Sequence, residues 1–383
     1  MKYIIKFYTL LTFLILFGFN SYATNKIKIG LVIPLSGENK ELGESVLKSV
    51  RLAVNDINDD RILIIPKDNQ NNPDRTLEVS QELYDEGVKI IIGPIFKKNS
   101  LKLTKLNEDL IFISFTNKIV SSNKNIISAG VNSISQFNAI KKFQTLNKIE
   151  RSFLLAPNTG VLDEIIAGVK RSKIKLKDKY FYDPDPTLIT KQIEDITRYR
   201  VRKQNLLDEI KRVEESNEVN KENKINQLKK LDTIGGINFD SIIIADFEES
   251  LKSVVTSLIY TDVSPKKKYI ITFNQWFDDS LIKETSLQPI YYPSINKKNL
   301  DDFKIKFFNE FNLYPNHLSL LSYDLVGLIY YLSLQNEVNN KEKFFKSKNT
   351  FKGKIGIFDI KDNKINHRLN FYQIDQGLIK KVF

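Results

Sequence analysis

The chain has 383 residues, and its 58 Lys and Arg against 46 Asp and Glu give a formal net charge of +12. This length favours two domains and allows sizeable cores without cross-links. The chain has no cysteine, which excludes disulfides, cysteine nucleophiles, thiolate metal sites and lipid attachment through an N-terminal cysteine. The positive charge is spread along the sequence, with no basic stripe that carries interleaved aromatic residues, so we expect no nucleic-acid partner.

The first 23 residues have the pattern of a secretory signal peptide. Lys2 and Lys6 precede an apolar run from Leu10 to Phe19, and Ser21 and Ala23 suit a cleavage site. The alternative is a retained membrane anchor, which needs about 20 apolar residues, and this run is shorter. We therefore predict cleavage after Ala23 and a periplasmic chain that is not a lipoprotein. No later segment is apolar enough to span a bilayer, so we expect no transmembrane segment after signal removal.

From residue 27 onward, apolar runs typical of buried strands alternate with segments of helical periodicity. Such alternation predicts right-handed crossovers and parallel sheets, that is, an α/β fold. Strands are predicted at 27–34, 62–65, 88–92, 111–115, 152–156, 180–182, 242–245 and 269–273. Helices are predicted around 42–57, 76–86, 99–107, 162–170, 251–258, 300–311 and 318–334.

Two segments depart from this alternation. Residues 189–231 are strongly charged and carry apolar residues at helical spacing, which predicts a long, partly solvated helix that fades into a polar, disordered stretch at 214–224. This charged helical insertion, at about 187–232, is either a solvated segment with no role or an arm that binds a partner. In the tail, residues 355–360 and 369–374 flank an Asp362-Asn363 turn and predict an antiparallel hairpin.

The sequence shows little catalytic apparatus. The only two histidines, His317 and His367, have no neighbouring carboxylate at metal-ligand spacing, and we expect surface or capping roles for both. No nucleophile elbow is present, and no P-loop or dinucleotide-binding glycine pattern follows the first strand. We therefore expect a non-enzymatic protein with no catalytic residue, no cofactor and no metal site.

Candidate ligand-binding residues lie in loops at the carboxyl ends of the predicted strands, because open parallel sheets bind ligands in the crevice outside those ends. Any of these residues can instead serve only in a turn or a helix cap, as Ser100 and Asp246 in particular can. The residues predicted to line a ligand cleft are Ser36, Gly37, Phe96, Lys97, Lys98, Asn99, Thr116, Asn117, Lys118, Asp246, Phe247, Gln275 and Trp276.

Residues 27–37, 53–58 and 87–94 resemble the corresponding stretches of leucine/isoleucine/valine-binding proteins, and the order of elements agrees over nearly the whole chain. The resemblance implies a type I periplasmic-binding-protein fold: two doubly wound α/β lobes, joined by three crossovers, with a ligand cleft between them. We expect the crossovers near Val131–Ile134, Pro289–Ser294 and Lys346–Phe351. The predicted domains are then 24–133 with 293–346 for lobe 1, and 134–292 with 347–383 for lobe 2.

A narrower resemblance is to penicillin-binding-protein activator homologues, and it rests on residues 154–160, 198–202, 272–279, 321–324 and 351–358. It implies a periplasmic protein that binds a peptidoglycan synthase and stimulates it. We therefore predict an activator-like regulator of peptidoglycan synthesis.

The alternative is the substrate-binding component of an ABC-type uptake system for amino acids or small anions, with a membrane permease as partner and a small molecule as ligand. Amino-acid binders hold the ammonium and carboxylate of their ligand with small hydroxyl residues and backbone groups after the third and fourth strands. Here those loops carry Lys97, Lys98 and Lys118, which suit an anion better than leucine.

Overall fold

The computed structural model describes residues 26–106, 109–118, 120, 125–335, 350–361 and 364–383. The predicted signal peptide and the predicted Asp362-Asn363 turn lie outside the described residues. In the part of the chain that is described, no helix combines the length and the apolar character needed to cross a membrane.

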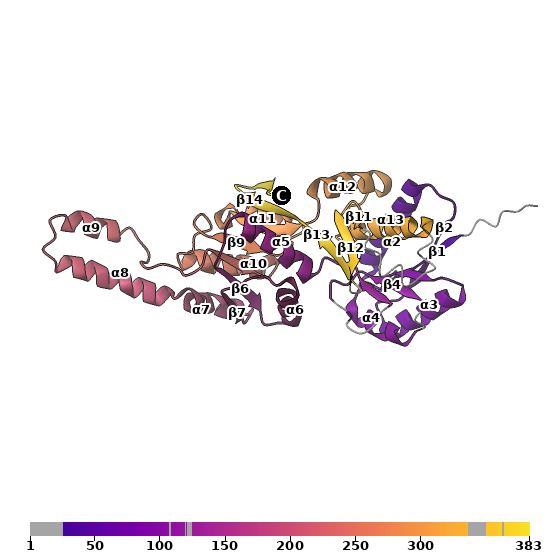
Figure 1. Cartoon of the computed structure of the whole chain (residues 1–383), viewed down its shortest axis with the longest axis horizontal. Helices are drawn as coiled ribbons and strands as arrows, with labels where there is room; N and C mark the ends of the chain where they lie inside the picture. Colours follow the sequence, from indigo (N-terminus) through magenta and orange to yellow (C-terminus); the bar gives the residue numbers. More distant parts are fainter. Residues whose placement is uncertain (1–25, 107–108, 119, 121–124, 336–349, 362–363) are drawn as a thin grey trace, which may run out of the picture.

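Two sheets with helices on their faces form two lobes that lie side by side (Figure 1). The first sheet has the order β11-β12-β13-β5-β4-β3-β1-β2, and the second has the order β15-β14-β10-β9-β8-β6-β7. The central strands of both sheets pair in parallel. The prediction of two doubly wound α/β lobes is confirmed.

In lobe 1 the sheet is covered by five helices among the described residues. Its strands are β1 (Ile27–Ile33), β2 (Ile62–Asp68), β3 (Ile90–Ile92), β4 (Ile111–Ser114), β5 (Ile126–Ser128), β11 (Thr350–Lys352), β12 (Ile357–Lys361) and β13 (Lys364–Arg368). Its helices are α2 (Lys40–Ile57), α3 (Pro73–Asp85), α4 (Lys97–Lys102), α12 (Lys297–Phe311) and α13 (Ser319–Leu334).

Lobe 2 repeats this arrangement. Its strands are β6 (Ser152–Pro157), β7 (Asp178–Tyr182), β8 (Ser241–Ile244), β9 (Tyr269–Thr272), β10 (Ile290–Ser294), β14 (Asn370–Asp375) and β15 (Leu378–Lys381). Its helices are α5 (Ser133–Leu146), α6 (Leu162–Ser172), α7 (Pro186–Thr197), α10 (Glu248–Tyr260) and α11 (Asp279–Lys283). Strands β3, β4 and β8 are buried along their whole length, as expected for parallel strands covered by helices on both faces.

The described chain passes between the sheets after β5, after β10 and after β13. The predicted second crossover is placed too early, because β10 pairs with β9 and β14 through Ser294. The predicted third crossover at Lys346–Phe351 is wrong. Residues 350–368 extend the sheet of lobe 1, where Lys364 of β13 pairs with Ser128 of β5. They therefore belong to lobe 1 and not to lobe 2.

The predicted terminal hairpin is partly wrong for the same reason. Strand β12 does pair antiparallel with the next strand, but that strand is β13, at residues 364–368. Residues 370–375 form β14 and pair with β10 in the other sheet. Leu369, which is 9% exposed, is the single residue between β13 and β14. The local pattern of apolar residues predicts a strand but does not say which of two sheets it joins.

The prediction of one long helix at 189–231 is also wrong. Helix α7 belongs to lobe 2, where it packs against α10 and buries Ile189 and Ile193. The helix breaks at Arg198, which adopts a left-handed conformation with φ of 54°. Beyond this break, α8 (Tyr199–Glu214) and α9 (Lys221–Leu228) form a helical hairpin, so the stretch expected to be disordered is a turn followed by the start of α9.

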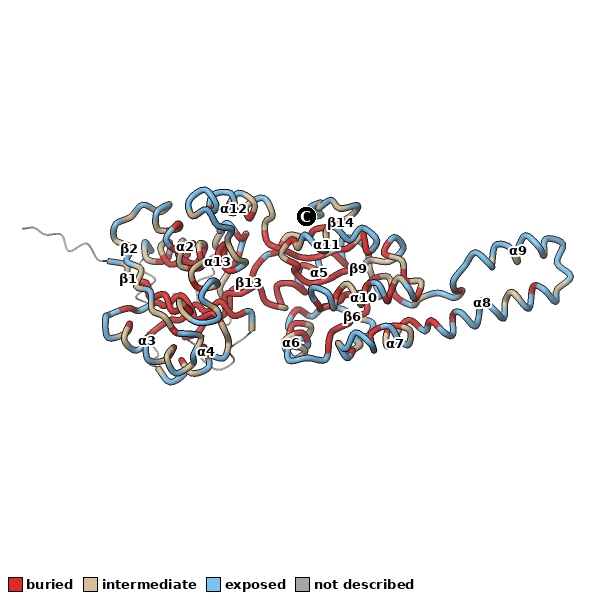
Figure 2. The backbone as a smooth tube through the Cα atoms, turned by 180° about the vertical axis from the view of Figure 1, so that it is seen from behind, coloured by how far each residue is buried: buried red, intermediate tan, exposed pale blue. Residues whose placement is uncertain are grey.

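We call residues 199–231 the arm. It projects from the end of lobe 2, and most of its residues are exposed, whereas the central strands β6 and β8 of the lobe are buried (Figure 2). Its root is fixed by Arg202, which is 5% exposed. The Arg202 guanidinium donates hydrogen bonds to the carbonyl oxygens of Thr197 (3.0 Å) and Thr261 and to the hydroxyl of Thr233 (2.8 Å). The arm is therefore held rigidly at its base.

Candidate functional site

A cavity of about 380 Å³ lies between the two lobes, at the carboxyl ends of their strands. Lobe 1 lines it with the loops after β3 and β4, the segment at 130–131 and the start of α13. Lobe 2 contributes α5 and the loops after β8 and β9. Its walls thus come from the positions where open parallel sheets bind ligands. We call this cavity the cleft.

The structure brings part of the predicted set of ligand residues to the cleft. The predicted residues that line it are Phe96, Lys97, Thr116, Asn117, Lys118, Phe247 and Trp276. The predicted residues that are not among its lining are Ser36, Gly37, Lys98, Asn99, Asp246 and Gln275. A role in ligand binding stays a prediction for the first group.

Most residues of the second group make hydrogen bonds within the protein that account for their presence without a ligand. The Ser36 hydroxyl donates to the Asp68 carboxylate at 2.6 Å, inside the turn that contains Gly37. The Asp246 carboxylate accepts hydrogen bonds from Tyr182, from Ser250 at 2.5 Å and from the backbone N–H of Phe247 at 2.8 Å. These are turn and helix-start contacts.

The remaining three differ in their surroundings. The Gln275 amide donates to the Asp246 carbonyl oxygen at 3.0 Å. Asn99 is fully buried, and its amide donates to Asn71 at 3.0 Å, while its own side-chain oxygen has no hydrogen-bond partner among the described residues. Lys98 is exposed, next to Lys97. None of the three lines the cleft.

Lys97 and Lys118 give the cleft its charge, because no Asp or Glu is among the described residues that line it. Lys97 makes one ion pair, with Glu164 of α6 at 3.5 Å. The His317 ring packs against that of Trp276, with 5.6 Å between centroids. His317 is exposed, yet desolvation by the groups around its ring lowers its pKa below the ordinary value.

Asn274 is a buried residue of the cleft whose hydrogen bonding is incomplete. It is 3% exposed, and its side-chain oxygen accepts hydrogen bonds from the backbone N–H of Trp276 at 3.0 Å and from the Ser294 hydroxyl at 2.7 Å. Its side-chain N–H₂ has no partner among the described residues. A buried donor without a partner costs about 1–3 kcal/mol, a cost that a ligand oxygen in the cleft would remove.

The loop that carries Asn274 is also conformationally unusual. Trp276 and Phe277 have φ of 50° and 61°, two successive left-handed residues that are not glycine. Such conformations cost roughly 1–3 kcal/mol each and cluster at binding sites. From this loop the sequence predicts only Gln275 and Trp276 as ligand residues. Asn274, two residues after the end of β9, is not among the predicted ligand residues, and His317, for which a surface or capping role is expected, is exposed and also lines the cleft.

The Asn274 amide can therefore donate a hydrogen bond to an anionic or oxygen-rich ligand in the cleft, and the Lys97 and Lys118 side chains can attract such a ligand by their positive charge. Among the described residues of the cleft lining, no hydrogen bond joins a hydroxyl group to His317 or to a lysine side chain. Within the described ranges, no group of three or more His, Cys, Asp or Glu residues could hold a metal ion.

Residues 26–173 match the family model described as periplasmic binding protein. A putative branched-chain amino-acid ABC transporter protein from Rhodospirillum rubrum is similar in structure, with a TM-score of 0.69 at 10% identity over 93% of this chain and 100% of that chain. The chain has the type I periplasmic-binding-protein fold. The resemblance stated from the sequence is confirmed at this level.

Two further structures share this fold. The C-domain of LpoA from Haemophilus influenzae, a regulator of PBP1A, has a TM-score of 0.62 at 14% identity, over 93% of this chain and 100% of that one. LivJ from Streptococcus pneumoniae, solved in complex with isoleucine, has a TM-score of 0.52 at 16% identity, over 93% and 98%. The similarity covers 59% of full-length LpoA. The comparison with curated proteins finds no match.

In a fold whose lobes close on a hinge, contacts across the cleft report the degree of closure. The Lys97–Glu164 ion pair and the Trp276–His317 ring contact both join lobe 1 to lobe 2. Opening the cleft must break both. The lobes are therefore in mutual contact in this structure.

Proposed function

We propose that the chain is a periplasmic, non-enzymatic regulator of peptidoglycan synthesis that binds a penicillin-binding protein through the arm. The observation that carries the proposal is the arm itself, a rigidly rooted projection that a protein built only to enclose a small solute does not need. The similarity to the C-domain of LpoA, over the whole length of that domain, supports the choice of partner.

The arm has the character of a contact surface rather than of a core element. Leu206 and Val213 are buried, whereas Leu207 (53% exposed) and Val219 (101%) face solvent. Ordering a residue costs roughly 1–2 kcal/mol of conformational entropy, and the arm adds little to the core of lobe 2. A partner that covers the exposed apolar side chains would repay this cost.

We expect the double variant L207D/V219D to bind the synthase at least about tenfold more weakly, because buried interface positions do not tolerate unpaired charge. The measurement is biolayer interferometry of the full chain against a purified bifunctional penicillin-binding protein from the same organism, together with the glycan polymerisation rate of that enzyme. Both substituted residues are exposed, so the fold should be unaffected.

The matched control is I305D/L313D in lobe 1, where the side chains are 62% and 50% exposed. It introduces the same two charges away from the arm and should leave binding unchanged. Equal losses in both variants, or a wild-type chain that neither binds nor stimulates the synthase, would refute the proposal.

A second candidate function is the capture of a small anion for uptake, and one observation favours it. The unpartnered Asn274 amide and the Lys97 and Lys118 side chains converge on the cleft without a lining carboxylate among the described residues. This set suits a ligand that carries a carboxylate or phosphate group.

If the cleft takes such a ligand, K118Q should weaken binding about tenfold through the loss of one charge-assisted hydrogen bond. K98Q should have no effect, because Lys98 is exposed and outside the lining. Calorimetric titration with dicarboxylates and acidic amino acids measures both. A ligand at 100 times its Kd should also add about 2.7 kcal/mol of stability. Indifference to every compound would count against capture.

A further inference from the structure

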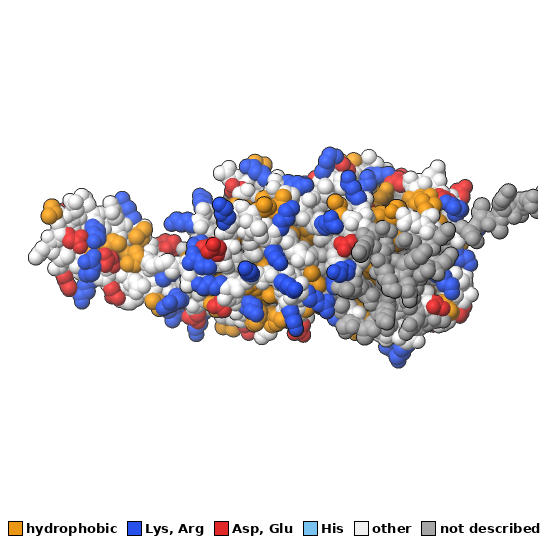
Figure 3. Space-filling view, viewed as in Figure 1, with side chains coloured by type: hydrophobic (Ala, Val, Ile, Leu, Met, Phe, Trp, Pro, Cys, Tyr) orange, Lys and Arg blue, Asp and Glu red, His pale blue; other side chains and the backbone are white. Residues whose placement is uncertain are grey.

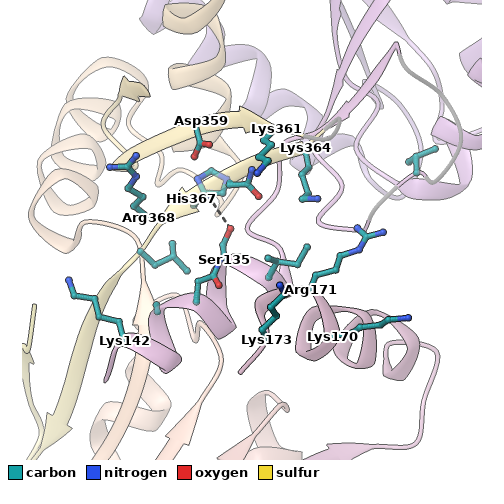
Figure 4. Close-up of a pocket in the computed structure, with 16 residues that line it drawn as sticks. Ser135, Lys142, Lys170, Arg171, Lys173, Asp359, Lys361, Lys364, His367 and Arg368 are labelled. Atoms are coloured by element: carbon teal, nitrogen blue, oxygen red, sulfur yellow. Dashed lines mark hydrogen bonds between the residues drawn. The ribbon is translucent and has the colours of Figure 1, made fainter. Parts of the chain in front are cut away.

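A second and larger cavity, of about 920 Å³, lies where α5 and α6 of lobe 2 meet β12 and β13 of lobe 1. We call it the basic pocket. It uses another face of α5 than the cleft does: Ser135, Asn138 and Lys142, at helical spacing, line the basic pocket, whereas Gln136 lines the cleft. Cationic side chains from α5, from α6 and its C-terminal end, and from the two strands surround it (Figure 4).

The charge of the basic pocket is strongly unbalanced. Among the residues that the structure describes, seven Lys and Arg side chains line it against the single carboxylate of Asp359. Among the described residues, no ion pair joins an Asp or Glu to Lys170, Arg171, Lys173, Lys361 or Arg368. Elsewhere on the molecule, lysines and arginines commonly do pair with carboxylates. Figure 3, in the orientation of Figure 1, shows Lys and Arg side chains over the middle of the molecule, where the two lobes meet.

Like charges held around one hollow repel one another and raise the local positive potential, which concentrates anions there. The donors come from opposite walls, so one singly charged ion cannot satisfy them. Arg171 and Arg368 offer planar guanidinium groups that match two oxygens of a phosphate, and Asn138 and Asn366 add amide donors. The described part of the lining has no Phe, Tyr or Trp, residue types that commonly anchor protein partners.

We propose that the basic pocket binds an anion with two or more phosphate groups and thereby holds the two lobes in one orientation. Lobe 2 contributes four of the cations, from α5, α6 and the residue after α6: Lys142, Lys170, Arg171 and Lys173. Lobe 1 contributes Lys361 and Arg368. An anion that bridges them links the lobes beside the Leu369 crossover. Because the cleft lies between the same lobes, occupation of the pocket and of the cleft are coupled, and the coupling is reciprocal. The proposal does not depend on the function of the arm.

The phosphate groups can be free in solution or displayed by lipid headgroups, and two probes distinguish these sources. The first is calorimetric titration of the full mature chain with tripolyphosphate. The second is co-sedimentation with phosphatidylcholine vesicles that contain or lack cardiolipin, a lipid with two phosphates. If the anion is free in solution, we expect saturable binding of one tripolyphosphate per chain. If the source is a lipid, we expect sedimentation that depends on cardiolipin and no binding of tripolyphosphate.

The test variant is R171Q/K361Q/R368Q, whose three side chains are all exposed, so folding should be preserved. It should weaken binding to the active probe at least about tenfold, since charge-assisted hydrogen bonds contribute about 1.5–3 kcal/mol each. The control K230Q/K266Q/K267Q removes three charges at exposed sites outside the pocket and should bind like the wild type. Binding of neither probe, or equal behaviour of the two variants, would overturn the proposal.

Discussion

Replacing Asp324 with alanine is expected to lower the free energy of unfolding by about 4 kcal/mol. Asp324 lies in α13 and is 3% exposed. Its two carboxylate oxygens accept the backbone N–H groups of Lys354 (2.8 Å) and Ile355 (2.7 Å). Alanine would leave both donors without partners, one of them in the buried Ile355. The contact attaches the loop between β11 and β12 to α13, so the edge of the lobe 1 sheet should loosen first.

Urea unfolding followed by circular dichroism measures this effect. The control is D302A, because Asp302 in α12 is 57% exposed and pairs only with Lys298, a surface contact worth about 0–1 kcal/mol. Gly353 gives an independent check: a Cβ there would stand 2.2 Å from an Asp324 oxygen, so G353A should also destabilise. A D324A chain as stable as D302A would show that the carboxylate contributes nothing to the loop.

The second large effect is on the pH dependence of stability, where H367Q should remove a loss of about 3 kcal/mol between about pH 6.5 and pH 4. His367 is 5% exposed, with its Nε2 2.8 Å from the Ala129 carbonyl oxygen, and burial lowers its pKa to about 4. In that window the unfolded chain binds a proton that the native chain does not, so the wild type loses stability as the pH falls.

Asp324 acts in the opposite direction. Burial raises its pKa to about 7, and the hydrogen bonds from Ile355 and Lys354 limit the rise. Between about pH 3.8 and 7 the native chain therefore holds a proton that the unfolded chain has released, so this contribution to stability grows as the pH falls. In the wild type the two groups partly cancel, and H367Q should expose the Asp324 contribution.

The measurement is the unfolding free energy of the wild type and H367Q at about pH 6.5 and about pH 4. The result is the difference between the two chains in the slope of unfolding free energy against pH. The contributions of titrating groups that both chains share cancel in this difference. H317Q serves as the control, because it keeps His367 and should keep the acid-dependent loss. Parallel curves for the wild type and H367Q would mean that His367 is protonated in the native state.

The sheets could be predicted because their central strands are buried on both faces. Residues 27–33, 111–114 and 241–244 are mainly apolar in the sequence and form strands in the structure, and that signal is local. The assignment of residues 350–368 to a lobe could not be predicted locally. It depends on the pairing of β13 with β5, which joins residues far apart in the chain.

The candidate site also has features that local sequence predicts and features that depend on contacts between distant residues. Strand ends could be located from the sequence, so Lys97, Lys118 and Trp276 were placed at a cleft. The missing partner of Asn274 and the packing of His317 on Trp276 depend on side-chain geometry between lobes. Along the sequence, the positive charge of the chain is evenly spread. The fold concentrates it, by bringing the end of α6 next to β12 and β13.

The single-residue crossover at Leu369 also constrains the order in which the protein can fold. The sheet of lobe 1 lacks β13 until residue 364 has been made, and the sheet of lobe 2 lacks β14 until residue 370. Neither lobe can be completed before nearly all of the chain has emerged, so the two must finish almost together. Contacts this distant in sequence slow folding, and until they form, β5 and β10 expose unpaired edges that invite aggregation.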